Sequence, residues 1–266
     1  MSVARQISVP AIRITAEQEP FLAVRSLATN YFSGYRIEPH QHQWHQLLFA
    51  SSGAMTISTS RSSWMIPTGR AVFIPPRTVH AIRMWGMVEM RTLYLSPQLT
   101  TFENDECRVV EVAPLLRELI LRSVERMGLD SRVAPDTWVI RLLEEEVKAA
   151  MAAAADSPLT LPMPTEERAL ALAHHVLARP WNVNGESVEE LAQRHGVARR
   201  TLERRFRDET GMSFGMWRQK ARLLDSIRLL AEGKSVTDAA LDCGYSSVSA
   251  FIAAFKSTFG YTPGRL

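Results

Sequence analysis

Three histidines and one glutamine in the first third of the chain have residue types and spacing that suit a ligand site. His40, His42 and Gln46 lie an even number of residues apart, so a regular strand places them on one face and His45 on the other. His80, arriving on a second strand, could join them. Three imidazoles and one oxygen could hold a divalent metal ion such as zinc, iron or nickel. We favour an organic effector, or hydrogen bonds among these side chains, because Gln46 brings no charge to a metal.

A second group of residues, between Arg194 and Arg222, has the chemistry to bind phosphates. Nine basic residues stand against three acidic ones over this span. The whole net charge of +3 lies in residues 165–266, because residues 1–164 hold equal numbers of each sign. A local positive field of this density attracts a nucleic-acid backbone. A solvated helix surface could carry the same charge, so the structural elements on which these residues lie must distinguish it from a nucleic-acid-binding surface.

Length and composition set the class of protein. The chain has 266 residues, 46% hydrophobic and 22% charged, which allows two globular domains. No apolar run approaches the ~18 residues of a membrane span, and the first residues lack the apolar stretch of a secretory signal. Cys107 and Cys243 are far apart and have no CxxC partner. We therefore expect a soluble cytoplasmic protein without a disulfide framework.

Short strands predict the fold that positions the histidines. Between about residues 20 and 97, apolar and β-branched segments alternate with glycines and prolines, which is typical of a sandwich or barrel. The clearest such segments are 46–50, 54–59, 71–74 and 90–95.

Two helices follow, over residues 113–127 and from Asp136 to about 155. Apolar residues recur with a helical period, and Asp136 is placed to cap the second helix. These helices could cover the strands or pair with a second copy of the chain. We favour a homodimer, formed through an apolar face of Leu115, Leu119, Leu142, Leu143 and Val147.

Three prolines in residues 156–164 predict an extended linker between an N-terminal domain, 1–155, and a C-terminal domain, 165–266. The second domain has only helical patterns. Thr165 is placed to cap its first helix and Pro180 to end it. The further helices are expected over 187–195, 198–209, 214–232, 235–242 and 247–258.

An internal repeat in this domain predicts two helix-turn-helix units, at about 187–210 and 235–259. SVEELAQRHGVARRTLERRFRDETGMS matches SVTDAALDCGYSSVSAFIAAFKSTFGYT. Each copy has an alanine that lets its helices approach, a glycine at the turn, and an inward phenylalanine, Phe206 or Phe255. The second helix of each unit then offers its outer face to a major groove.

The pattern from Ser187 to the final FKSTFGYTPGRL resembles the AraC family of transcription regulators, over the last hundred residues. The resemblance implies double-stranded DNA as a partner, with RNA polymerase as a candidate second partner. Base-reading positions fall on Arg200, Glu203 and Arg204 of the first unit and Ser249 of the second. The second unit is less polar there, so the first should discriminate sequence. Phosphate contacts are expected from Arg199, Thr201, Arg205, Arg207, Ser246, Ser247 and Lys256.

The histidine segments, Gly34–Gly53 and Gly69–His80, resemble the two motifs of the cupin barrel. Gln46 stands where cupins have glutamate, Arg77 replaces a glycine and Met84 an asparagine. The resemblance implies an N-terminal sensor whose pocket holds His40, His42, Gln46 and His80, with a metal at the three histidines as the alternative.

These observations together predict a two-domain α+β protein, with a cupin-like β-barrel, two following helices and an all-α domain with two helix-turn-helix units. The function expected is that of a sequence-specific DNA-binding regulator, not an enzyme, controlled by a small molecule or metal. Two alternatives stay open: a cupin-type metalloenzyme, dioxygenase or isomerase, with a helical appendage, and an effector-independent DNA-binding dimer.

Overall fold

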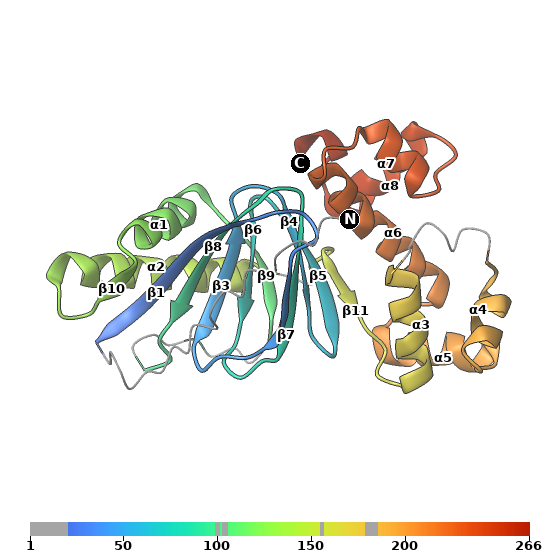
Figure 1. Ribbon diagram of the computed structural model, residues 1–266, viewed down its shortest axis with the longest axis horizontal. Helices are drawn as coiled ribbons and strands as arrows, with labels where there is room; N and C mark the ends of the chain where they lie inside the picture. The colour runs from blue at the N-terminus through green and yellow to red at the C-terminus, as the bar shows by residue number, and fades with distance from the viewer. Residues whose placement is uncertain (1–20, 99–101, 103–105, 155–156, 179–185) are drawn as a thin grey trace, which may run out of the picture.

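The computed structural model describes residues 21–98, 102, 106–154, 157–178 and 186–266. A sheet-rich N-terminal part lies beside a helical C-terminal part (Figure 1). The two-domain α+β prediction is therefore confirmed. No helix within these ranges is long and apolar enough to cross a membrane.

The strands form two sheets that pack face to face. One has six strands in the order β10-β1-β8-β3-β6-β9, the other five in the order β11-β5-β4-β7-β2, and all described ladders are antiparallel. The bounds are β1 (Leu22–Tyr31), β2 (Arg36–His40), β3 (His45–Ala50), β4 (Ala54–Ser58), β5 (Ser62–Pro67), β6 (Arg70–Ile74), β7 (His80–Trp85), β8 (Val88–Leu95), β9 (Arg108–Glu111), β10 (Gly128–Asp130) and β11 (Thr160–Pro162).

The predicted barrel does not close, because no ladder between the described strands joins one sheet to the other. The edge strands of the five-stranded sheet each contain a proline, Pro39 in β2 and Pro162 in β11. Proline lacks a backbone N–H and suits a strand that ends a sheet. The N-terminal domain is thus an open, cupin-like sandwich.

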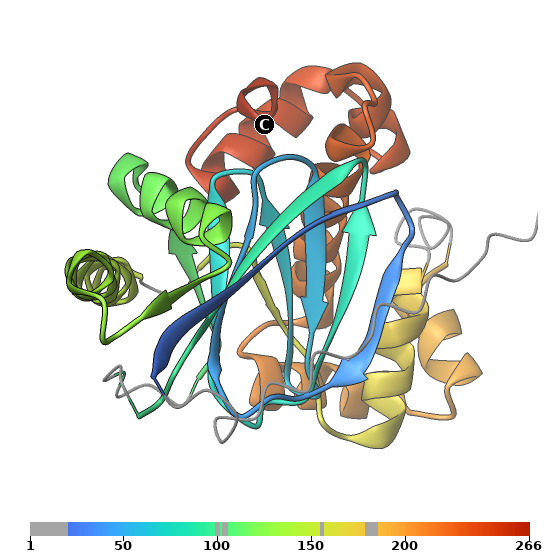
Figure 2. The ribbon, with the colours of Figure 1, turned by 60° about the vertical axis from the view of Figure 1, so that its left-hand side comes forward.

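Two helices, α1 (Pro114–Glu125) and α2 (Ala134–Ala153), cover the outer face of the six-stranded sheet (Figure 2). All six residues of β3 are buried, since one face of the strand meets the other sheet and the opposite face meets these helices. The outer face forms its own apolar core with Leu116, Ile120 and Leu143 of the helices.

This packing buries some residues of the predicted dimer face and leaves others exposed. Leu119, Leu143 and Val147 are at most 8% exposed and belong to the core under the helices, so their predicted role at a dimer surface is wrong. Leu115 and Leu142 remain 46% and 43% exposed. The apolar stripe of these helices is mainly the cover of the sheet.

The prediction that Asp136 caps α2 is also wrong. The helix begins two residues earlier, after Val133, which makes no side-chain cap hydrogen bond. Asp136 is buried, accepts a hydrogen bond from the backbone N–H of Asp130 at 3.1 Å and forms an ion pair with Arg126 at 2.6 Å. Its carboxylate joins α1, β10 and α2, which the helix pattern alone did not indicate.

The C-terminal domain contains both predicted helix-turn-helix units, formed by α4 with α5 and by α7 with α8. Serines cap α4, α6, α7 and α8, and Ser187 forms a full capping box with Glu190. Gly211 and Gly260 end α5 and α8 with φ of 72° and 82°, a conformation that favours glycine. The bounds are α3 (Glu167–Ala178), α4 (Val188–Arg194), α5 (Arg199–Thr210), α6 (Phe214–Ala231), α7 (Val236–Asp242), α8 (Val248–Phe259) and the 3-10 helix η2 (Pro263–Arg265).

The start of α3 differs from prediction. Thr165 does not cap it, because the helix begins at Glu167, and the Thr165 hydroxyl donates instead to Glu209 at 3.0 Å. Instead the carboxylate of Glu166 accepts from the backbone N–H of Ala169 at 2.9 Å. Pro180, the predicted stop, lies outside the described residues.

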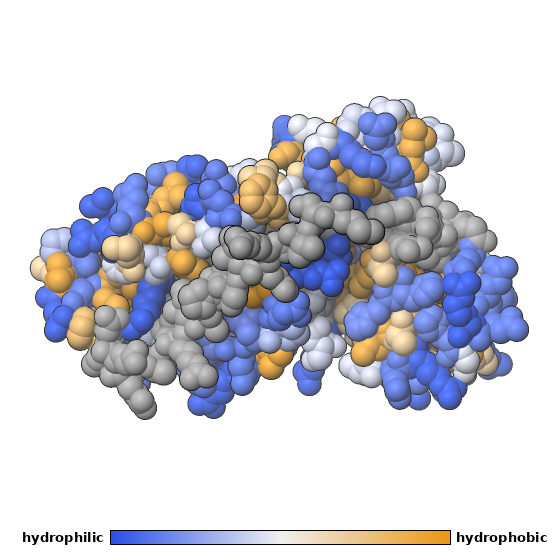
Figure 3. All heavy atoms as spheres, in the orientation of Figure 1, coloured by the Kyte–Doolittle hydropathy of each residue, from blue (hydrophilic) through white to orange (hydrophobic). Residues whose placement is uncertain are grey.

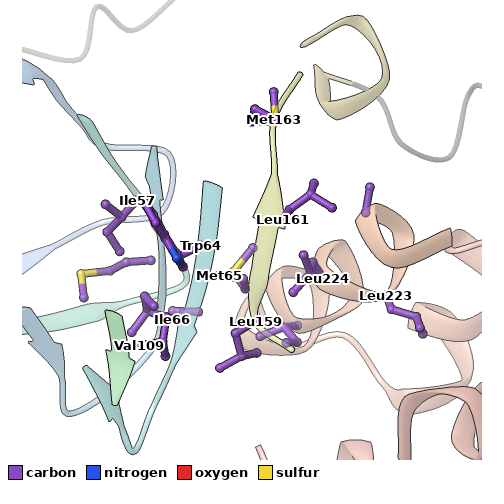
Figure 4. Close-up of a cluster of buried hydrophobic side chains, with 14 of the residues drawn as sticks. Ile57, Trp64, Met65, Ile66, Val109, Leu159, Leu161, Met163, Leu223 and Leu224 are labelled. Atoms are coloured by element: carbon purple, nitrogen blue, oxygen red, sulfur yellow. The ribbon is translucent and has the colours of Figure 1, made fainter. Parts of the chain in front are cut away.

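The proline-rich segment is part of a continuous core between the two domains. Its residues 160–162 form β11, which extends the five-stranded sheet beside β5. Leu159, Leu161 and Met163 are at most 5% exposed and pack with Met65 on one side and Leu224 of α6 on the other (Figure 4). The segment predicted as a linker therefore attaches the helical domain to the sheet; its residue 156 is not among those described.

Candidate DNA-binding surface and ligand pocket

Helix α5 has one buried face and one exposed basic face. Leu202 and Phe206 are fully buried. Arg200, Arg204 and Arg207 are exposed, and none of their guanidinium groups has an ion pair or hydrogen bond to any residue of the described ranges. In the space-filling view, hydrophilic residues dominate the α4–α5 end of the molecule, at the right (Figure 3). These three guanidinium groups can therefore meet an external anion.

Other residues predicted to contact DNA are engaged within the domain. The carboxylate of Glu203 accepts from the backbone N–H of Phe214, the first residue of α6, at 3.3 Å. Arg199 forms an ion pair with Glu189, and Arg205 lies 3.7 Å from Glu209. Thr201 is half-buried. Of the predicted first-unit residues, Arg200, Arg204 and Arg207 are thus the most available.

The second unit exposes a less polar face. Ser246, Ser249 and Lys256 are exposed, whereas Ile252 is half-buried. Ser247 caps α8 by accepting from the backbone N–H of Ala250 at 3.2 Å, and its O–H can still donate to another group. This face therefore offers the ammonium group of Lys256 and the hydroxyls of Ser246, Ser247 and Ser249.

The predicted histidine cluster forms. The ring centroids of His40 and His80 are 4.3 Å apart, those of His42 and His80 are 5.2 Å apart, and those of His40 and His42 are 6.3 Å apart. Gln46 lies 3.0 Å from His42 Nε2 and also contacts the hydroxyls of two β8 residues, Thr92 and Tyr94. His45 faces the other way, stacked on Phe73 with a centroid distance of 5.3 Å, as its position in the strand predicts.

Each ring of the cluster is held by a backbone carbonyl. His40, His42 and His80 donate from Nδ1 to the carbonyl oxygens of Glu38, Trp44 and Thr78, at 2.9, 2.5 and 2.9 Å. A carbonyl only accepts, so each Nδ1 carries a proton; in the neutral ring of His80 this leaves Nε2 as the acceptor, whereas Nε2 of His42 faces Gln46 Oε1, which also only accepts. Burial lowers the pKa of His42, and it lowers that of His80 to about 4. The His80 ring is therefore neutral at pH 7.

The cluster does not fit a metal site. No group of three or more His, Cys, Asp or Glu side chains within the described ranges is placed to hold a metal ion. His42 Nε2 is occupied by Gln46. His80 Nε2 is buried and has no hydrogen-bond partner in the described structure. We derive no metal chemistry from these residues, which instead suit hydrogen bonds to an organic molecule.

Replacing His80 with glutamine is expected to weaken the pH dependence of stability. Unfolded His80 binds a proton below its ordinary pKa of 6.5, whereas the folded protein binds it only near 4. The free energy of unfolding should therefore fall as the pH drops through this window, by ~2 kcal/mol between about pH 7 and 5 for one such group, and be constant above it. Urea unfolding at several pH values measures the slope. Equal slopes for both proteins would contradict the neutral, buried His80.

Sequence reasoning missed a cavity between the domains. It has a volume of about 450 Å³ and lies between the outer face of the five-stranded sheet and helices α3 and α6. Arg83 and Trp85 reach it from β7, and Arg228 from α6. The signal available in the sequence was the alternation along β7 of Ile82 and Met84 with Arg83 and Trp85, which indicates a strand whose two faces meet different environments.

An N-terminal sheet sandwich with an internal histidine cluster, followed by two helix-turn-helix units with an exposed basic face, defines the class of two-domain DNA-binding transcription regulators. Residues 23–147 match the model of the AraC-like ligand binding domain, and residues 191–266 match that of a helix-turn-helix domain. This chain belongs to the AraC family of transcription regulators.

The relatives agree with this class. The HTH-type transcriptional regulator NimR of Escherichia coli K12 is 30% identical over 228 residues, covering 85% of this chain and 80% of NimR. The transcriptional activator RhaS of Pectobacterium carotovorum is 22% identical over 240 residues, covering 85% of this chain and 86% of RhaS. Among solved structures, ToxT from Vibrio cholerae aligns over 91% of this chain and 97% of its own, with a TM-score of 0.38 and 12% identity.

Proposed function

We propose that this regulator reads base edges mainly with Arg200 and Arg204 of α5. The observation that carries the proposal is their exposure, without an ion pair among the described residues, on the face opposite the buried Leu202 and Phe206. Arginine is the most frequent specific reader of guanine, through bidentate hydrogen bonds to O6 and N7. A helix held by a buried face presents these two side chains, one turn apart, to a major groove.

Phosphates are the proposed targets of the other exposed polar residues. Arg207 and Lys256 supply charge, and Ser246 a hydroxyl, while Ser249 is the one polar base-reading candidate of the second unit. Arg199, Thr201, Arg205 and Ser247 flank the same surface as secondary phosphate contacts. Glu203 already holds α5 against the start of α6, so we assign it a positioning role.

Selection of bound duplexes from a random DNA pool tests this function. The purified full-length chain should enrich a motif in which guanines dominate the best-conserved positions, because two arginines face the groove. A recurring spacing between two half-motifs would report how many units and protomers bind. No enrichment at low salt, with folded protein, would contradict sequence-specific binding.

A small organic effector in the sandwich is the proposed regulator of DNA binding. His80 supports this role because its buried Nε2 is an acceptor that has no hydrogen-bond partner among the described residues, and it can accept from a ligand N–H or O–H. Similarity to a named transcription regulator favours this function over that of a cupin-type dioxygenase or isomerase. A purely structural N-terminal domain would leave the buried acceptor unexplained. With DNA as its partner, the protein is expected in the cytoplasm.

We propose that the protein forms a homodimer through the residues of α1 and α2 that remain exposed beside the sheet. Trp138 is 72% exposed and lies one turn before the exposed Leu142 on α2, and Leu115 is exposed on α1. Hydrophobic residues are interspersed on this end of the surface, at the left of Figure 3.

Trp138→Glu is expected to convert the protein to a monomer in sedimentation velocity, because a charge in an apolar interface is costly. Leu241→Glu, at another exposed apolar position, on α7, should leave the dimer intact. An unchanged sedimentation coefficient for Trp138→Glu would place the interface elsewhere.

A further inference from the structure

The cavity between the domains has an apolar side and a charged side. Met65 of β5, Leu161 of β11 and Leu224 of α6 form the apolar side, and Figure 4 shows them facing one another between the sheet and the helix. The charged side comes from strands β2 and β7 and from the second half of α6. Both domains therefore contribute walls to one space of about 450 Å³.

Three arginines gather around one tryptophan on the charged side. Arg36 and Arg83 are opposite each other in the β2–β7 ladder, and both line the cavity. The guanidinium of Arg83 lies 4.0 Å from the Trp85 ring centroid, and that of Arg228 lies 5.1 Å from it. The indole N–H of Trp85 donates to Thr56 at 2.7 Å, which fixes the ring between them.

The three arginines differ in whether acidic side chains neutralise their charges. Arg228 forms ion pairs with Asp225 at 2.6 Å and with Glu232 at 2.5 Å. Arg36 and Arg83 form no ion pair with any residue that the structure describes, and Arg83 Nε is buried without a hydrogen-bond partner. Burial is also the main cause that lowers the pKa of Arg83, followed by repulsion from Arg36 and Arg228. A buried N–H donor of this kind is normally satisfied in a folded protein.

We propose that this cavity binds a small organic carboxylate with an apolar body. Arg83 and Arg36 bind the carboxylate, since a guanidinium matches a carboxylate in a bidentate pair, and the body lies against Met65, Leu161 and Leu224. The volume is within the range of small-molecule sites. Glu38 and Asp225 also line the cavity and disfavour a ligand with several negative charges.

Such a ligand would hold the two domains in their docked arrangement. Gly86, in the turn after β7, packs so tightly that a Cβ there would lie 2.2 Å from the carbonyl oxygen of Ala231, and Ser33 donates to Glu232 at 2.9 Å. A molecule whose site has walls from both domains binds this arrangement better than a separated one, and so shifts the population toward it. This regulatory step rests on the proposed function as a DNA-binding regulator; the binding site itself does not.

Calorimetric titration of the full-length protein with octanoate tests the site, with octanol as the uncharged comparison. Octanoate should bind, and octanol at least tenfold more weakly. Arg83→Gln should weaken octanoate binding at least tenfold, and Arg36→Gln, at an exposed position that does not support the core, should also weaken it. Ala81→Trp should block the cavity. His80→Gln, in the sandwich interior, should bind octanoate as the unaltered protein does.

Absence of octanoate binding, or equal binding by the unaltered protein and the Arg83 and Ala81 variants, would overturn the proposal. Loss of binding in His80→Gln alone would also overturn it, by placing the ligand inside the sandwich. The affinity for the selected duplex is then measured with and without octanoate. A protein that binds octanoate as described but enriches no DNA motif would contradict the proposed function while leaving the cavity proposal intact.

Discussion

Phe206→Ala is expected to lower the free energy of unfolding by ~3–5 kcal/mol, the cost of a cavity left by a buried phenylalanine. Phe206 is fully buried on the inner face of α5. Its ring packs edge-on against Phe214 at a centroid distance of 5.0 Å and against Trp217 at 5.2 Å. Because these two aromatics start α6, the cavity would separate the reading helix from the helix that supports it.

The effect should extend to the domain junction. The indole N–H of Trp217 donates to the carbonyl oxygen of Pro162 at 2.7 Å, and Trp217 lies in the core shared by the two domains with Leu161 and Met163, the neighbours of Pro162. Urea unfolding followed by tryptophan fluorescence measures the change. Met216→Ala is the matched control on α6, because Met216 is 62% exposed, and it should change stability by no more than ~0.5 kcal/mol. Equal stability of the two variants would mean that Phe206 is not a core anchor.

Arg204→Ala is expected to weaken binding to the selected duplex by ~1–3 kcal/mol and to relax the preference at one base position. The alanine removes the two guanidinium N–H donors that would bind one guanine. Arg204 forms no ion pair or side-chain hydrogen bond with any described residue. Binding to random DNA should change less, because it depends on phosphate contacts. Competition titrations with selected and random duplexes at several salt concentrations measure both affinities.

Arg207→Ala is the matched control, three residues along the same exposed helix. If Arg207 contacts a phosphate, its loss should weaken both duplexes alike and reduce the slope of log affinity against log salt by about one. An unchanged ratio of specific to random affinity in Arg204→Ala would show that Arg204 contacts the backbone. The reading role would then be left to Arg200.

The helix-turn-helix repeat could be predicted from the sequence because its signals are local. A serine that caps a helix bonds to a backbone N–H three residues later, and a glycine ends a helix through its own φ angle. Ser187 and Gly211 therefore mark the first unit before any tertiary contact is known. The histidine cluster was predictable for a similar reason, since alternation along a strand sets which side chains share a face.

Tertiary structure decided which surfaces are free. The apolar period of α2 could not tell that Leu143 is buried while Leu142 and Trp138 face outward. The prolines predicted an extended segment, but only pairing with β5 made Thr160–Pro162 a strand between the domains.

The cavity between the domains shows the same limit. Arg83 and Arg228 are 145 positions apart in sequence, and no local pattern links them. The fold brings both to the Trp85 ring, within 4.0 and 5.1 Å of its centroid. Periodicity records the preferences of a chain over a few residues, whereas a site built from two domains depends on how their separate faces pack together.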